Sequence, residues 1–86
     1  MKRYEVLIVA RADKKLAQMQ RILRERIIEK FDEISKDPRH TDSKKLDEAT
    51  YRVRVGDYRI VYHVNDAEHT VLVTRIRHRR EVYRRR

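Results

Sequence analysis

The stretch that decides the fold spans residues 51–62 and reads Tyr51-Arg52-Val53-Arg54-Val55-Gly56-Asp57-Tyr58-Arg59-Ile60-Val61-Tyr62. Apolar and polar side chains alternate on both sides of Gly56-Asp57. Alternation is typical of a strand with one buried face, and a two-residue turn that begins with glycine is typical of a β-hairpin. The sequence therefore predicts two antiparallel strands, at 51–55 and 58–64, joined by a tight turn.

The register of this hairpin predicts which side chains share a face. It pairs Val55 with Tyr58, Arg54 with Arg59, and Val53 with Ile60. One face, expected to lie toward the helices, then carries six side chains: Tyr51, Val53, Val55, Tyr58, Ile60 and Tyr62. Arg52, Arg54 and Arg59 share the other face, where directly opposed arginines repel. We interpret this patch as an anion-binding site; the alternative is a solvated face with glutamates nearby.

The N-terminal part of the chain predicts a strand and two helices. The apolar run at 4–9 indicates a strand buried on both faces. Residues 12–36 have helical spacing, and their apolar stripe, which Ile22 and Ile28 widen, consists of Leu16, Met19, Leu23, Ile27, Phe31 and Ile34. One helix of that length would span about 37 Å, so we expect a break near 18–20 into two antiparallel helices. Asp37-Pro38 ends the second helix.

The remaining segments complete one small domain. Residues 39–50 are expected to form a loop with Leu46 as its large apolar anchor, and 65–67 to form a turn. Residues 70–76 predict a third antiparallel strand, and 77–86 a basic tail. The order indicates an α+β fold, in which helices cover one face of a sheet, as a single domain over residues 1–86.

Composition limits the classes of function. The chain has 86 residues with 23 basic and 14 acidic side chains, a net charge of +9, 40% hydrophobic residues and no cysteine. A single glycine excludes a Gly-rich phosphate loop. No apolar run approaches the roughly 18 residues of a membrane span, and no signal peptide opens the chain, so we expect a cytoplasmic protein with no membrane partner.

The basic charge is concentrated in arginine. All ten basic side chains in residues 51–86 are arginine, against four acidic ones. The planar guanidinium matches phosphate, so nucleic acid is the expected partner, although excess charge for solubility is the alternative. Tyr83 stands among the C-terminal arginines and could stack on a base or anchor the terminus on the sheet.

Histidines and metal ligands give weaker signals. His78 could be an acid–base group, a phosphate contact or a surface residue. His40, His63 and His69 lack the spacing of metal ligands, so we predict no metal and no cofactor. No Ser/His/Asp arrangement is indicated.

The hairpin, together with Arg77-His-Arg-Arg-Glu-Val-Tyr83, resembles the RelE family of toxins from bacterial and archaeal toxin–antitoxin pairs. Similar residues occur in that family at three further places: 14–16, 37–39 and 44–46. The resemblance implies an N-terminal strand, a helical hairpin, an antiparallel β-meander and a short C-terminal segment. It also implies an endoribonuclease that enters the A site of the 30S ribosomal subunit and cuts mRNA by attack of the 2′-hydroxyl, without a metal.

The resemblance also assigns roles to residues. The implied catalytic set is Arg52, Arg54, Arg59, His78, Arg79 and Tyr83. The residues expected to bind RNA are Arg75, Arg77, Arg80, Lys44 and Lys45. Arg52 and Arg54 replace lysines of studied members, and arginine cannot act as a base, so proton transfer is left to Tyr83 or His78.

Partners and competing functions follow from the same resemblance. An acidic, RelB-like antitoxin is implied, besides the ribosome and mRNA. Arg77 stands where many relatives have glycine, and residues 84–86 could contact ribosomal RNA or be a solvated tail. Two alternatives share the fold: a ParE-like poison of DNA gyrase, and a catalytically silent module that only binds RNA or a partner.

Overall fold

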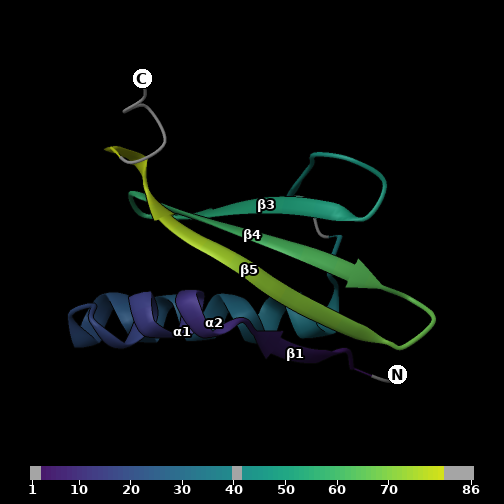
Figure 1. Cartoon of the computed structure of the whole chain (residues 1–86), viewed down its shortest axis with the longest axis horizontal. Coiled ribbons are helices and arrows are strands. Elements are labelled where there is room, and N and C mark those ends of the chain that lie inside the picture. Colours follow the sequence, from purple (N-terminus) through teal and green to yellow (C-terminus); the bar gives the residue numbers. More distant parts are fainter. Residues whose placement is uncertain (1–2, 40–41, 81–86) are drawn as a thin grey trace.

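The chain folds as two helices packed on one face of a five-stranded sheet. The computed structural model describes residues 3–39 and 42–80. Its elements are β1 (Glu5–Ile8), α1 (Ala10–Ala17), α2 (Arg21–Lys36), β2 (Lys44–Lys45), β3 (Thr50–Val55), β4 (Tyr58–Asn65) and β5 (Thr70–His78). The strand order is β1-β5-β4-β3-β2, and Figure 1 shows both helices on the same side of the sheet. The predicted α+β fold is confirmed.

The sheet is mixed. β1 pairs with β5 in parallel, whereas the β5–β4, β4–β3 and β3–β2 pairs are antiparallel. The helices form the connection that returns the chain from β1 to the far edge at β2. The predicted three-strand meander is therefore confirmed, and the N-terminal strand joins it at the β5 edge.

The predicted break in the helical segment is confirmed. α1 ends at Ala17 and α2 begins at Arg21, so Gln18–Gln20 form the turn. The Arg24 guanidinium donates to the Met19 carbonyl at 2.9 Å, which satisfies one backbone group that the break exposes. A side chain thus stabilises a turn that no glycine or proline marks.

The core lies between the helices and the inner face of the sheet. The predicted stripe is buried, with Leu23 partly buried, and of the six inward hairpin residues only Tyr58 is half-buried. The largest fully buried side chains are Tyr62, Ile27, Ile34, Ile60, Val53, Val71 and Val73. Each contributes roughly 1.5–3 kcal/mol relative to an exposed position.

Three apolar residues do not lie where the sequence predicts. β1 is an edge strand whose outer face no helix covers, so Leu7 is 44% exposed and the prediction of burial on both faces was wrong. Ile22 and Ile28 point away from the sheet, and Ile22 is 71% exposed. They do not widen the stripe, because one residue turns a helix by about 100°, which places Ile22 and Ile28 on opposite sides of the buried row that contains Leu23 and Ile27.

The segment at 39–50 also differs from the expected loop. It contains the short strand β2, which pairs with β3, and Leu46 is 49% exposed and lies outside the core, so the prediction of an apolar anchor was wrong. Polar groups fix the segment instead: Asp47 accepts hydrogen bonds from the backbone N–H groups of Ala49 and Thr50 at 3.1 and 2.9 Å. At the other end of the sheet, β5 continues to His78, two residues beyond the predicted strand.

One polar cluster ties four separate segments together at the end of the sheet that carries the β4–β5 turn. Arg39 forms a bidentate ion pair with Asp66, at 2.9 and 3.2 Å, and its Nε donates to the Tyr51 hydroxyl at 2.9 Å. The Tyr4 hydroxyl donates to Asp66 at 2.6 Å, and the Tyr4 ring stacks on His69 at 3.9 Å. The Tyr4 hydroxyl and Arg39 together hold the pKa of Asp66 below its ordinary value. The cluster therefore joins four segments: the chain before β1, the segment that follows α2, strand β3, and the turn after β4.

Asp66→Asn tests the ionic part of this cluster. Because the pKa of Asp66 is lowered by folding, its carboxylate stabilises the fold above the unfolded-state pKa of about 3.9, and this contribution is lost as pH falls through the folded-state pKa. We expect urea denaturation to show Asp66→Asn as less stable than the wild type at pH 7, with the difference shrinking below about pH 4. Glu68→Gln, which removes a carboxylate from the same turn outside the cluster, is the control. A difference independent of pH would contradict the ionic contribution.

Candidate functional site

Two rows of cationic residues cross the outer face of the sheet, which the helices leave uncovered. In the first row, Arg54 of β3 lies opposite Arg59 of β4, and Arg59 lies opposite Arg77 of β5. In the second row, Arg52 lies between Lys44 of β2 and Val61, and Val61 lies opposite Arg75. Neighbouring strands are about 4.8 Å apart, so the charges are closely spaced. We call these six cationic residues the basic rows: Lys44, Arg52, Arg54, Arg59, Arg75 and Arg77.

A β-bulge puts the two arginines of β5 on this face. The register shifts between Val61 and Tyr62, so that Thr74 is the extra residue on β5. Val71 and Val73 face the core, and without the extra residue the same alternation would turn Arg75 and Arg77 toward the helices. The Thr74 hydroxyl donates to the Val61 carbonyl at 3.3 Å and so occupies the acceptor opposite the bulge.

Three clefts border the basic rows at Arg54. One, of about 310 Å³, is lined by Asp42, Lys44, Arg52, Val53 and Arg54. A second, of about 70 Å³ at the hairpin turn, is lined by Arg54, Gly56, Asp57, Tyr58, Arg59 and Arg79. A third, of about 230 Å³, brings Arg54 near Glu29 and Glu33 of α2. Acidic side chains therefore lie beside the rows at Arg54, and Arg54 links the sheet face to the hairpin turn.

Asp42 is a residue of this site that sequence reasoning missed. Along the chain, the acidic residues nearest to the arginine patch are Asp57 and Glu48. Asp42 reaches the rows only because β2 pairs with β3, and its carboxylate also lies 3.5 Å from Lys30 of α2. The short β2 strand gave no signal in the sequence, so neither did Asp42.

Arg79 joins the site through the hairpin turn. Its backbone N–H donates to the Asp57 carbonyl at 2.7 Å, and its guanidinium lies 4.0 Å from the Asp57 carboxylate. Both side chains are well exposed. This hydrogen bond holds the start of the C-terminal segment against the 56–57 turn, beside Arg54 and Arg59.

The structure does not bring all of the predicted residues to one face. His78 lies opposite Tyr58, on the face that the helices cover, with its ring edge-on to the tyrosine at 5.1 Å. Its Nδ1 accepts from the Arg80 backbone N–H at 3.1 Å. Lys45 pairs with Tyr51 and so alternates away from Lys44. Tyr83 and the arginines at 84–86 lie outside the described residues, so their roles stay predictions.

The part of the chain that the structure describes contains neither a cluster of metal ligands nor a membrane-spanning helix. In the ranges 3–39 and 42–80, no three His, Asp or Glu side chains gather as metal ligands would, and no helix is long and apolar enough to cross a membrane. The prediction that the protein uses no metal or cofactor stays a prediction.

The basic rows define what this face can do chemically. Guanidinium groups stay charged and donate in fixed planes, which suits bidentate contact with phosphate oxygens. Three guanidinium groups in one row can donate hydrogen bonds to adjacent phosphates. They can also stabilise negative charge that develops on one phosphate during a reaction. Arginine cannot give up its proton in a protein, so the five arginines of the rows can bind and stabilise charge without moving protons.

Comparisons with known proteins agree with this architecture. The family model described as "ParE toxin of type II toxin-antitoxin system, parDE" matches residues 6–83. Toxin RelG of Mycobacterium tuberculosis is 33% identical over 57 residues, which span 64% of this chain and 66% of RelG. A chain of the archaeal RelE–RelB complex from Pyrococcus horikoshii OT3 is 28% identical with a TM-score of 0.80, over 88% of this chain and 94% of that chain. The isolated E. coli RelE toxin is 26% identical with a TM-score of 0.78, over 87% of this chain and 83% of its own.

The fold and its uncovered basic face thus define the class, a toxin of type II toxin–antitoxin systems. The matching family model carries the ParE name, whereas the curated relative and the solved structures are RelE proteins. The chain belongs to the family that this model describes, the ParE-type toxins of type II toxin–antitoxin systems, and it is similar to RelE proteins of the same RelE/ParE superfamily, as the resemblance predicts.

Replacing Arg77 tests whether the first row costs stability. Arg59 and Arg77 are directly opposed, and like charges in that position destabilise a sheet. We expect Arg77→Glu to raise the free energy of unfolding by about 0.2–1 kcal/mol in urea denaturation, because it creates an opposite-charge pair with Arg59 and because, unlike Arg54, Arg77 has no carboxylate lining the cleft beside it. Arg21→Glu, which breaks the 3.8 Å ion pair with Glu25, is the control and should show no gain. An equal loss of unfolding free energy in both variants would show that Arg59 does not repel Arg77.

Proposed function

We propose that this toxin is a ribosome-dependent endoribonuclease that cuts mRNA in the A site and so inhibits translation in the cytoplasm. The observation that carries the proposal is the row Arg54–Arg59–Arg77, three directly opposed arginines on an uncovered sheet face. Folding alone disfavours such a row, whereas a bound phosphodiester would stabilise it.

The chemistry needs only groups that the chain carries. The 2′-hydroxyl oxygen attacks the adjacent phosphorus, the bond from phosphorus to the 5′-oxygen breaks, and the products are a 2′,3′-cyclic phosphate and a 5′-hydroxyl. Arg52, Arg54, Arg59 and Arg79 would hold the phosphate oxygens and stabilise the added negative charge of the phosphorane. One group must take the 2′-hydroxyl proton and another must give a proton to the 5′-oxygen. Tyr83 and His78 remain the predicted candidates.

His78 is placed less favourably than sequence reasoning expected. It shares the face of Tyr58, whereas the arginines of the first row share the opposite face. A nucleotide bound on the rows would reach it only around the end of the sheet. This placement favours Tyr83, a prediction that lies outside the described residues.

We further propose that an acidic antitoxin neutralises the toxin. Solved relatives include RelE–RelB complexes from Pyrococcus horikoshii and M. tuberculosis. The net charge of +9 suits an acidic partner, and a segment that covers the basic rows would block RNA.

A ParE-like function is the second candidate, and the ParE family-model match is the observation that favours it. ParE-like toxins poison DNA gyrase and generally lack the full arginine set together with a terminal tyrosine. This chain carries both in its sequence, so we rank the nuclease first. A silent module that binds RNA without cleaving it is the remaining alternative.

Primer extension on a ribosome-paused mRNA with an empty A site tests the nuclease. We expect the wild-type protein to produce a new cut within the A-site codon, and none without ribosomes. Arg59→Ala should reduce the rate by about 10²–10³-fold, because it removes a fixed donor to the developing charge. The double variant Tyr83→Phe, Arg59→Ala should abolish the cut.

Arg21→Ala is the matched control, since Arg21 is an exposed arginine of α2 outside the basic rows. It should cleave at the wild-type rate, and thermal melting should show Arg59→Ala folded. No cut by a folded, antitoxin-free wild type would reject the nuclease. Inhibition of DNA supercoiling by that protein would then establish the gyrase poison.

A further inference from the structure

A second basic cleft lies beside the basic rows, between α1 and β5. It has a volume of about 350 Å³, and the residues that line it are Arg11, Ala12, Lys15, Arg75, Ile76 and Arg77. Four of these six residues are cationic, and no carboxylate is among them. Sequence reasoning did not single out Arg11 or Lys15 as members of a site.

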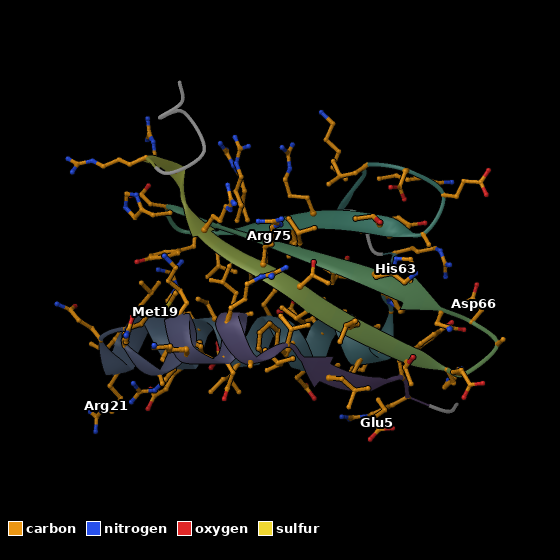
Figure 2. The ribbon with its side chains drawn as sticks, in the orientation of Figure 1. Glu5, Met19, Arg21, His63, Asp66 and Arg75 are labelled. Atoms are coloured by element: carbon orange, nitrogen blue, oxygen red, sulfur yellow. The ribbon has the colours of Figure 1, made fainter. Side chains whose placement is uncertain are left out.

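The cleft follows from the short first strand. β1 pairs with β5 only as far as Val73, and α1 begins two residues after β1 ends. The second half of β5 therefore has α1, and no further strand, along its edge. Figure 2 labels Arg75 in this part of β5, where the strand passes over the helix pair. Arg11 and Lys15 are four residues apart on α1 and so lie on one side of the helix.

Arg75 and Arg77 belong to both surfaces. The register places them in the basic rows, and the cleft places them beside Arg11 and Lys15. The positive surface is therefore continuous from β3 across the sheet to α1. Like charges gathered around a recess of this size raise the local concentration of an anion and favour its binding.

We propose that the α1–β5 cleft binds a phosphodiester of the same RNA strand whose neighbouring phosphates lie on the basic rows. The first row spans two inter-strand spacings, or about 10 Å, and the cleft is the next position along the same line beyond β5. The RNA then leaves the sheet over the β5 edge, held by Arg11 and Lys15. This inference rests on the proposed function only in taking the polyanion to be RNA.

Binding of uncleavable RNA tests the proposal without requiring nuclease activity. The probes are a fluorescently labelled 2′-O-methyl uridine hexamer, long enough to reach the cleft, and the corresponding dimer, which has one internucleotide phosphate. The variant is Arg11→Ala, Lys15→Ala. Its matched control is Lys14→Ala, Arg21→Ala, which removes one lysine and one arginine at exposed helix positions outside the cleft.

We expect the cleft variant to bind the hexamer about tenfold more weakly than the wild type, and the control to differ by less than about twofold. Each lost phosphate contact should reduce the slope of log K against log salt by about 0.7. Dimer binding should be unchanged, because one phosphate occupies the rows alone. Alanine suits a helix, and thermal melting should show both variants folded.

Three results would overturn the proposal. If the control variant binds the hexamer as weakly as the cleft variant, the loss is a general effect of charge. If the cleft variant also binds the dimer about tenfold more weakly, Arg11 and Lys15 contact the first phosphate and not a neighbouring one. Loss of binding to empty ribosomes with unchanged hexamer binding would assign the cleft to ribosomal RNA. If the wild-type protein and its variants bind the hexamer as expected but the wild type does not cut mRNA on ribosomes, the cleft proposal stands and the proposed nuclease function is rejected.

Discussion

The functional face depends on one inserted residue in β5. Side chains alternate along a strand, so a single extra residue exchanges the faces of everything that follows it. Thr74 is that residue: before it, Val71 and Val73 pack into the core, and after it Ile76 takes the core position while Arg75 and Arg77 face outward. Both basic surfaces, the rows and the α1–β5 cleft, include these two arginines. A β5 of the same composition without the bulge would bury two charges beneath the helices, which folding does not tolerate without partners.

The hairpin, the helical stripe and the fold class could be predicted because each rests on local periodicity. The pairing of Arg54 with Arg59 follows from a two-residue turn and needs no tertiary information. The bulge also leaves a trace, since apolar residues at 71, 73 and 76 break the period of two. The turn at 18–20 was predicted from the length of the helical segment and from the family resemblance, whereas the contact from Arg24 that stabilises it could not be predicted.

The sequence predictions were wrong or incomplete where the exposure or the neighbours of a residue depend on the position of its element in the folded sheet. The apolar run of β1 reads as a doubly buried strand, but an edge position with one uncovered face leaves Leu7 in solvent. β2 has two lysines and no apolar pattern, so only its pairing with β3 identifies it and brings Asp42 to the site. Arg11 and Lys15 look like ordinary solvated charges on α1 until the packing against β5 is known.

The Arg39–Asp66 cluster and the first of the basic rows occupy opposite ends of the β4 strand. The cluster fixes the β4–β5 turn to the chain before β1 and after α2, while the first row lies beside the turn at Gly56. Substitutions at one end therefore leave the contacts of the other intact. The charged residues near the Gly56 turn can therefore change during evolution while the contacts that stabilise the fold stay the same. That freedom is a physical basis for one small fold acquiring different cellular targets among its descendants.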